Sequence, residues 1–314
     1  MAIPRKPRDT INTMQYIGRF APSPSGPLHF GSLIAATASY LCAKSVQGQW
    51  LLRIEDVDKF RIKENSINSI LHTLESYGYQ WDGDILYQSQ RSEAYQYALD
   101  SLGKLTYPCT CTRKFLQRQT PANTCGYVYA GYCREQISNP EAKQFSIRLR
   151  TNNSVICFKD ALQPLYCQNI EAEVGDFIVK RSDSMFSYQL AVVVDDEYQQ
   201  ISEVVRGSDL LDNTPRQLYL QQCLGYKQPT YLHFPTAITK DGKKLSKQNH
   251  SPEVDEYQKR QTILRTLNFL GQQAPAIDYF SSLDDLWDWA IKNWDRDKIP
   301  AQMTLPENYP NESL

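Results

Sequence analysis

The chain has 314 residues, of which 41% are hydrophobic, and its formal net charge is −1. It contains no apolar run as long as a membrane span, and its first 15 residues lack the apolar segment of a signal peptide, so we expect a cytoplasmic protein that makes no membrane contact. The near-neutral charge excludes a generic polyanion binder, although a local basic face can still hold RNA.

The first elements along the chain predict an α/β fold. An apolar pair at 16–17 indicates a strand, and after a turn rich in Pro and Gly a helix without any breaker follows over 31–46. The run 50–56 indicates a second strand, so these three elements form a βαβ unit and predict a parallel sheet. Apolar residues at helical spacing predict an amphipathic helix over 66–77.

Later segments suggest an insertion into this frame. The alternating runs 145–150 and 155–160 predict inserted antiparallel strands, and 176–194 with 201–211 returns to strand-and-helix patterning. Helices are expected over 254–270 and 283–294, before a tail that contains prolines. We therefore divide the chain into 1–108 (first half of the α/β frame), 109–175 (inserted subdomain with a Cys-rich segment at 109–133), 176–250 (second half of the frame) and 251–314 (short helical C-terminal region).

The most informative segment starts at Arg19, between the first strand and the first helix. This order places backbone N–H groups and the positive end of a helix dipole where a phosphate can sit. Arg19 and His29 are suited to meet anions, and Gly31 leaves room for a nucleobase against the backbone. The segment is Arg19-Phe20-Ala21-Pro22-Ser23-Pro24-Ser25-Gly26-Pro27-Leu28-His29-Phe30-Gly31-Ser32.

This segment resembles the first signature of class I glutamyl-tRNA synthetases, in which His-x-Gly-His follows Arg-Phe-Ala-Pro-Ser-Pro. The resemblance implies a Rossmann-type parallel sheet that holds ATP between two signatures. The second signature, Lys-Met-Ser-Lys-Ser, is similar to 244–248 (Lys-Leu-Ser-Lys-Gln), although a lysine-rich loop taken alone is more often a solvated surface. Lysines in such a loop would follow the charge that grows on the α-phosphate. Ser32 and Gln248 depart from the family pattern, which puts the rate in doubt more than the reaction.

The resemblance also assigns site residues elsewhere. Glu55 is implied to meet the amino group of glutamate, Tyr188 to hydrogen-bond in that pocket, and Arg206 to meet a substrate carboxylate. Two arginines and one carboxylate complement glutamate, whereas each of these residues taken alone would indicate only a surface ion pair. The residues implied for glutamate are Arg19, Phe20, Ala21, Pro22, Ser23, Glu55, Tyr188 and Arg206. Those implied for ATP, which carries Mg²⁺, are His29, Gly31, Ser32, Lys244, Ser246 and Lys247, with His29 and Lys247 as the catalytic pair.

Only about 65 residues follow Gln248, which we expect to be too few for a helical anticodon-binding domain. The chain therefore resembles the truncated paralogues of the family, the glutamyl-Q tRNA(Asp) synthetases. This resemblance implies that a monomer attaches L-glutamate, activated with ATP, to the queuosine base of tRNA-Asp. Two alternatives are a non-catalytic paralogue that binds glutamate or RNA, and another class I-like ligase that adenylates a carboxylate.

Four of the eight cysteines cluster at 109, 111, 125 and 133, a spacing that suits tetrahedral zinc. The family pattern instead implies Cys109, Cys111, Tyr129 and Cys133 as the ligands, and Cys125 remains a competitor for the fourth position. We expect core or half-buried positions for the other cysteines, which are Cys42, Cys157, Cys167 and Cys223. Basic residues near the cluster would face tRNA phosphates or form a solvated surface; these are Arg113, Lys114, Arg118 and Arg134.

Overall fold

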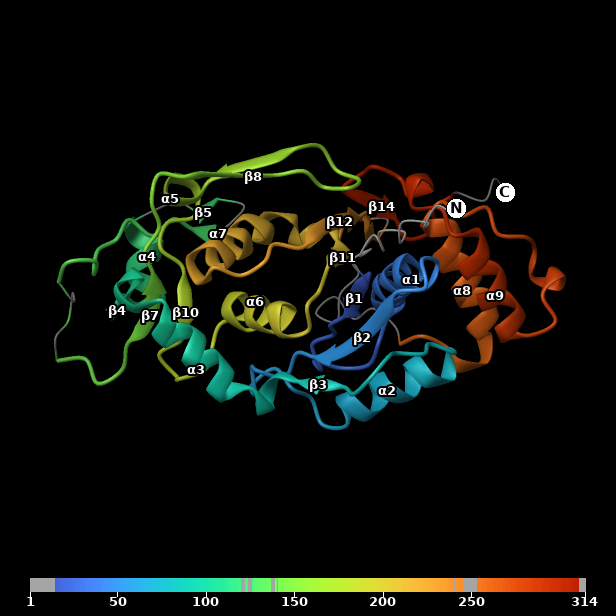
Figure 1. The fold of residues 1–314 in the computed structure, drawn as a ribbon, viewed down its shortest axis with the longest axis horizontal. Helices are drawn as coiled ribbons and strands as arrows, with labels where there is room; N and C mark the ends of the chain where they lie inside the picture. The colour runs from blue at the N-terminus through green and yellow to red at the C-terminus, as the bar shows by residue number, and fades with distance from the viewer. Residues whose placement is uncertain are drawn as a thin grey trace, which may run out of the picture.

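A parallel sheet occupies the middle of the elongated molecule, with an inserted subdomain at one end and two C-terminal helices at the other (Figure 1). None of the helices in the part of the chain that is described is long and apolar enough to cross a membrane. This computed structural model describes residues 15–119, 122–123, 126–136, 139, 141–239, 241–244 and 253–310.

The predicted βαβ unit forms the first half of the central sheet. Strands β1 (Ile17–Phe20), β2 (Gln49–Ile54) and β3 (Leu86–Tyr87) are parallel neighbours in that order. Helix α1 (Phe30–Lys44) makes the crossover from β1 to β2. The sequence prediction of a parallel arrangement is confirmed here.

The second half of the sheet lies on the other side of β1. Strands β11 (Glu203–Gly207) and β12 (Thr230–Phe234) form a parallel pair. A backbone hydrogen bond of 2.9 Å from Ser202 N to Ile17 O ties the start of β11 to β1. Residues 185 positions apart in the sequence therefore lie beside one another in the sheet.

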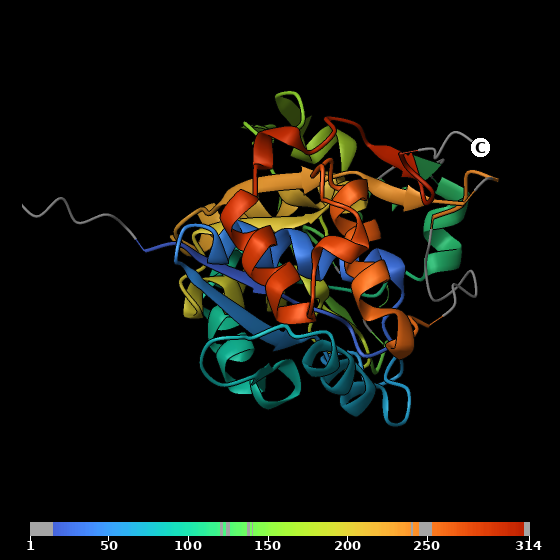
Figure 2. The same ribbon diagram turned by 90° about the vertical axis from the view of Figure 1, so that its right-hand side faces the viewer.

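Helix α1 is buried on both sides. Its inner face lies on the sheet and its outer face packs against α8 (Lys259–Phe269). Helix α9 (Leu283–Asn293) lies beside α8 in front of the sheet (Figure 2), and its Trp287 donates from Nε1 to the Tyr77 carbonyl oxygen at 2.9 Å. A helix covered on both faces needs apolar or small residues around most of its circumference, as the α1 sequence provides.

The inserted subdomain is built on an antiparallel sheet. Its strand order is β10 (Ile178–Lys180), β7 (Ser146–Leu149), β4 (Thr106–Cys109). Strand β8 (Val155–Phe158) instead pairs with β9 (Tyr166–Asn169) in a separate hairpin. The two strands predicted for this region therefore exist as β7 and β8, but they do not pair with each other. The subdomain also contains α4 (Arg113–Gln119), β5 (Ala122–Asn123), β6 (Gly126–Tyr127) and α5 (Ile170–Glu173).

The C-terminal part differs from the prediction in two respects. The helix expected over 254–270 starts at Lys259, after a short 3₁₀ turn. The expected tail contains β14 (Thr304–Pro306), which pairs in parallel with β13 (Thr236–Ile238) and satisfies backbone groups that would otherwise form an open edge. The remaining helices are α2 (Ser66–Ser76), as predicted, α3 (Ser92–Ser101), α6 (Tyr188–Tyr198) and α7 (Thr214–Leu224). Short 3₁₀ turns lie at Gln88–Gln90, Gly103–Leu105, Ser208–Asn213, Glu256–Gln258, Ile277–Tyr279 and Arg296–Lys298.

The expectation for the scattered cysteines is half right. Cys42 is buried in α1 and Cys223 is half-buried in α7, as expected. Cys157 and Cys167 are exposed, and they form a disulfide across the β8–β9 hairpin. The prediction for this pair was wrong because they occupy directly opposite positions on the outer face of two paired strands, and that pairing cannot be read from their spacing.

Gly175 lets two backbone segments of the inserted subdomain pack closely, because it has no side chain to meet the backbone of Tyr129. Its φ is +70°, and an added Cβ would lie 2.3 Å from the Tyr129 carbonyl oxygen. Gly225 has the same φ with nothing within 4 Å. We expect Gly225→Ala to lower the free energy of unfolding by about 1–2 kcal/mol and Gly175→Ala by about 2–5 kcal/mol, because of the added backbone clash.

Urea unfolding of both variants measures this difference. Equal losses of stability would show that the close approach at Gly175 contributes nothing beyond the left-handed backbone conformation that both positions share.

Candidate active site

Two buried arginines share one buried carboxylate beneath the carboxyl ends of the central strands. Arg19, on β1, donates from Nε to Asp196 at 3.1 Å, and Arg53, on β2, approaches the same carboxylate at 2.8 Å. Burial disfavours the charged form of Asp196, but the two arginines more than compensate and hold its pKa below the usual value. Asp196 therefore fixes both guanidinium groups in place.

Glu55 lies just after β2, beside this cluster. Its side chain is 8% exposed, and its Oε1 lies 3.6 Å from Arg53 Nη2. Burial raises the pKa of Glu55 to about 7, although Arg53 and Arg19 act in the opposite direction. A carboxylate in this condition gains free energy by meeting a cation, such as the ammonium group of an amino acid.

Arg206, at the end of β11, is held along one edge of its guanidinium. Nε donates to His233 Nε2 at 3.0 Å, and Nη2 donates to Thr214 Oγ1 at 2.8 Å. The residue is 5% exposed, and its Nη1 has no hydrogen-bond partner among the residues that the structure describes. A buried donor without a partner is costly, so this nitrogen indicates a place for a ligand oxygen.

Tyr188 connects these groups. It is the first residue of α6, where the Ser187 side chain caps the helix by accepting from Leu190 N. Burial raises the pKa of Tyr188, and the charges of Arg206, Glu55 and Arg19 also act on its hydroxyl. The structure thus brings Arg19, Glu55, Tyr188 and Arg206 into one neighbourhood, although they come from β1, the end of β2, α6 and β11.

The first signature loop is tied to the same place through its backbone. Pro22 O accepts from Glu55 N at 3.0 Å, and the Pro24 carbonyl accepts from Lys63 N at 3.1 Å. The Phe20 side chain lies in the core, stacked on Trp50 with ring centres 6.2 Å apart, so only its backbone remains for a ligand. Among the other predicted loop residues, the side chains of Ala21 and Ser23 are half-buried and exposed, respectively.

His29 caps the N-terminus of α1. Its Nδ1 accepts from Ser32 N at 3.3 Å, and Ser32 Oγ accepts from His29 N in return. In a neutral imidazole whose Nδ1 accepts, Nε2 carries the proton and serves as a donor. The His29 Nε2 proton therefore provides a hydrogen-bond donor at the positive end of a helix, next to Gly31 and Ser32.

The chain just after the second signature lies beside the first signature loop. Glu253, just beyond the second signature, forms an antiparallel bridge with His29, and Val254 N donates to Leu28 O at 3.3 Å. At the near side of the second signature, Lys244 forms an ion pair with Asp209. Ser246, Lys247 and Gln248 lie outside the described residues.

Asp196 and its neighbour Asp195 were missed by the sequence prediction. Asp195 accepts from Arg91 Nε at 2.8 Å and from Tyr95 Oη at 2.7 Å, and so holds α3 against α6. The available signal was a pair of aspartates directly after three valines (192–194), because carboxylates at the end of a buried run need partners. That signal does not identify Arg53 as one of those partners.

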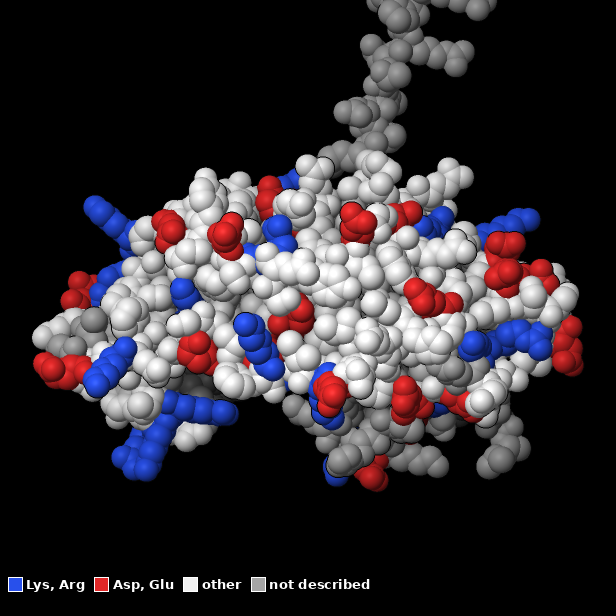
Figure 3. All heavy atoms as spheres, turned by 90° about the horizontal axis from the view of Figure 1, so that it is seen from below, with Lys and Arg blue, Asp and Glu red and all other residues white. Residues whose placement is uncertain are grey.

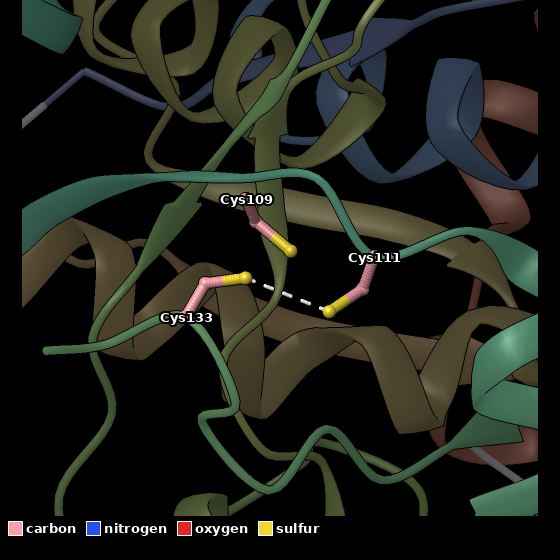
Figure 4. A group of neighbouring side chains, drawn as sticks. All are labelled: Cys109, Cys111 and Cys133. Carbon is pink, nitrogen blue, oxygen red and sulfur yellow. Dashed lines mark hydrogen bonds between the residues drawn. The ribbon is translucent and has the colours of Figure 1, made fainter. Parts of the chain in front are cut away.

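Three cysteines converge in the inserted subdomain (Figure 4). Their sulfurs lie within 4.8 Å of one another, with Cys111 Sγ 3.6 Å from Cys133 Sγ and Cys109 as the third member. The Tyr129 hydroxyl lies 3.3 Å from Cys109 Sγ and accepts from Cys133 N at 2.9 Å. This cluster is consistent with a metal site. Cys125 lies outside the described residues.

Basic residues around the cluster divide into two kinds. Arg134 is held by Asp176 at 2.6 Å and by Glu171 at 2.9 Å, so its charge is already used inside the subdomain. The α4 residues Arg113, Lys114 and Arg118 are exposed. Seen from below, the molecule shows Lys and Arg interspersed with Asp and Glu rather than a surface of one sign (Figure 3), as its net charge of −1 suggests.

Comparison with known proteins shows which family this arrangement resembles. Residues 16–287 match a family model described as the catalytic domain of class I tRNA synthetases (E and Q). A glutamyl-Q tRNA(Asp) synthetase of Pseudomonas entomophila (strain L48) is 47% identical over 95% of this chain and 99% of that protein. A glutamyl-Q tRNA(Asp) synthetase of Dechloromonas aromatica (strain RCB) is 46% identical over 92% of this chain and 97% of that protein. The crystal structure of a glutamate-tRNA synthetase from Elizabethkingia anophelis shares the fold, with a TM-score of 0.76 at 24% identity, covering 93% of this chain and 68% of that one.

The parallel sheet, the insertion and the match to the catalytic-domain model define an aminoacyl-tRNA synthetase-like ligase of class I. Within that class, the chain belongs to the glutamyl-Q tRNA(Asp) synthetase family.

The raised pKa of Glu55 predicts a pH-dependent effect on stability. The native state holds this proton up to about pH 7, whereas an unfolded glutamate, with a pKa of 4.5, loses it earlier. The native form is therefore penalised as the pH rises from 4.5 to 7. We expect Glu55→Gln to gain stability relative to the parent protein between pH 5 and pH 8, by on the order of 1–3 kcal/mol.

Urea unfolding across this pH range provides the measurement, with the exposed Glu64→Gln as the matched control. A difference between Glu55→Gln and the parent protein that stays constant with pH would contradict a raised pKa at Glu55.

Proposed function

We propose that this chain activates L-glutamate with ATP to form glutamyl-adenylate, and then transfers the glutamyl group to the queuosine base in the anticodon loop of tRNA-Asp. Membership in a family named for glutamyl-Q and tRNA(Asp) supports the amino acid and the acceptor. The observation that carries the amino-acid assignment is the convergence of buried Arg19, Glu55 and Arg206 around Tyr188.

The charges of the cluster complement glutamate. Arg19, Arg53 and Arg206 contribute three positive charges, and Asp196 and ionised Glu55 contribute two negative ones. One positive charge remains, which matches the net charge of −1 on glutamate. In this proposal Arg19 and Arg206 meet the two carboxylates, Glu55 meets the ammonium group, and Tyr188 donates a hydrogen bond to the side chain.

Activation needs positioning and charge neutralisation but no protein nucleophile. A glutamate α-carboxylate oxygen attacks the α-phosphorus of ATP, and the bond to the pyrophosphate oxygen breaks. His29, through its Nε2 proton, and Lys247 stabilise the oxygens of the transferring group and of the leaving pyrophosphate, while Gly31, Ser32, Lys244 and Ser246 complete the ATP site. Mg²⁺ held by the phosphates of ATP would neutralise further charge on the leaving group.

In the transfer step, a hydroxyl of the queuosine cyclopentenediol attacks the carbonyl carbon of the mixed anhydride, and AMP leaves. The exposed basic residues of α4 are candidates for tRNA phosphate contacts. We also propose that the protein acts as a monomer.

We propose that the cysteine cluster holds a structural zinc ion through Cys109, Cys111, Tyr129 and Cys133. A tetrahedral zinc–thiolate site with bonds of about 2.3 Å needs sulfurs about 3.8 Å apart, and Cys111 and Cys133 are already 3.6 Å apart. Arg148 donates from Nε to Cys109 Sγ at 3.2 Å and so places a positive charge beside the proposed ligands.

The proposed reaction predicts selective labelling of one RNA. Incubation with radiolabelled glutamate and ATP is expected to label tRNA-Asp that contains queuosine and to leave queuosine-free tRNA-Asp unlabelled. Lys247→Ala should lower glutamate-dependent ATP–pyrophosphate exchange by about a hundredfold or more, because charge on the leaving group is no longer neutralised. Lys243→Ala, on the same loop, is the matched control and should retain exchange.

Three outcomes would contradict this assignment. Absence of exchange in the parent protein would indicate a non-catalytic binding paralogue. Exchange with another amino acid or carboxylate in a panel would indicate a different adenylating ligase. Undiminished exchange in Lys247→Ala would remove that residue from the mechanism.

The zinc assignment is tested by metal analysis of purified variants. Cys111→Ser should lose zinc and Tyr129→Phe should lower its occupancy, whereas Cys125→Ala should keep it. Cys223→Ala, a half-buried free cysteine outside the cluster, serves as the control. Zinc lost in Cys125→Ala but kept in Tyr129→Phe would assign the fourth ligand to Cys125 instead.

A further inference from the structure

Behind Arg206 lies a chain of buried polar side chains that the activation step does not use. His233, on β12, accepts from Arg206 Nε at its Nε2, 3.0 Å away. The other ring nitrogen, Nδ1, lies 2.6 Å from Asp160 Oδ2. Asp160, His233 and Arg206 are 3%, 0% and 5% exposed, so water does not compete for these hydrogen bonds.

The chemistry of arginine determines which atom donates in each hydrogen bond of this series. A guanidinium has only donors, so His233 Nε2 must accept and the imidazole proton must lie on Nδ1. Nδ1 then donates to the Asp160 carboxylate. Burial, with Arg206 beside the ring, lowers the pKa of His233 to about 4 although the Asp160 hydrogen bond acts in the opposite direction, so the ring stays neutral at pH 7.

Asp160 is itself held in one orientation. Its Oδ1 accepts from the backbone N–H groups of Leu162 and Gln163, both at 2.9 Å, and of His233 at 3.2 Å. Its Oδ2 is therefore left for the imidazole. Asp160 lies just after β8, in the connection to β9, where Ala161 N donates to Tyr231 O of β12 at 2.8 Å. Figure 1 shows β8 running from the inserted subdomain towards β12.

We propose that Asp160 and His233 are positioning residues for glutamate recognition. Asp160 selects the imidazole tautomer with the proton on Nδ1, and this tautomer holds Arg206 Nε so that Nη1 remains for a substrate carboxylate. This inference rests on the proposed function of Arg206. It gives the β8–β9 hairpin a role in the amino-acid site, because the hairpin supplies the carboxylate at the far end of the chain.

Asp160→Asn separates positioning from simple packing. The amide oxygen must stay with the three backbone N–H groups, so the amide NH₂ faces His233 Nδ1 and favours the opposite tautomer. A proton on Nε2 then opposes the Arg206 N–H. Loss of a charge-assisted hydrogen bond of about 1.5–3 kcal/mol corresponds to a rise of about 10- to 150-fold in the KM for glutamate, with the KM for ATP unchanged.

Gln163→Met provides the matched control. Gln163 holds the same turn on β12 by donating from Nε2 to His233 O at 2.9 Å and to Gln302 O at 3.1 Å, and neither of these two hydrogen bonds involves the imidazole or the Arg206 side chain. Loosening this turn should lower the thermal stability in both variants. Only Asp160→Asn should raise the KM for glutamate in pyrophosphate exchange.

A spectroscopic measurement tests the tautomer without relying on activity. The chain has four histidines, so ¹⁵N spectra of the imidazole nitrogens can be assigned with a His233→Gln variant. At pH 7 we expect His233 in the Nδ1–H tautomer in the parent protein and in the Nε2–H tautomer in Asp160→Asn.

The outcomes separate this inference from the proposed function. A charged His233, or an Nε2–H tautomer in the parent protein, overturns the positioning role, as does an equal rise of glutamate KM in Gln163→Met and Asp160→Asn. A parent protein without glutamate-dependent exchange contradicts the proposed function instead. In that case two measurements on the parent and Asp160→Asn proteins still test the positioning role. One is the tautomer of His233, and the other is the affinity for glutamate, measured by calorimetric titration.

Discussion

The pairing of Asp196 with Arg19 and Arg53 is the constraint on which the site depends. Two guanidinium groups buried at 5% and 0% exposure would be prohibitively costly without a carboxylate between them. Once the three are locked together, the ends of β1 and β2 and the helix α6 have fixed relative positions. The positive charge left over raises the affinity for an anion and makes the buried carboxylate of Glu55 tolerable.

The opposite side of the site depends on a different kind of restraint. Arg206 is held by neutral acceptors, His233 and Thr214, rather than by a carboxylate, so its charge is not consumed within the protein. Asp160 stands one residue further back, where it orients the imidazole without neutralising the guanidinium directly. Among the residues that the structure describes, Nη1 of Arg206 is buried and has no hydrogen-bond partner.

Local patterns predicted the elements well and their partners less well. The crossover from β1 to β2, the helix α2 and the helix α9 follow from apolar periodicity within a few residues. Apolar periodicity did not predict the partners of β7 and β8, the strand β14 or the disulfide between Cys157 and Cys167. The pattern of a strand indicates which face is buried, but it does not indicate which strand lies beside it. The cysteine cluster was visible because three of its members lie within 25 residues of one another.

The class of fold, the two signature segments, the candidate glutamate residues and the cysteine cluster can all be identified from the sequence, since they depend on the short-range order of residue types. The burial of those residues, their pairing and the presence of an unused donor become visible only when the chain is folded. Arg19 and Asp196 are 177 positions apart, and Asp160 and His233 are 73 apart. Partners at such separations meet only through packing, because burial makes their mutual satisfaction necessary and chain order does not specify it.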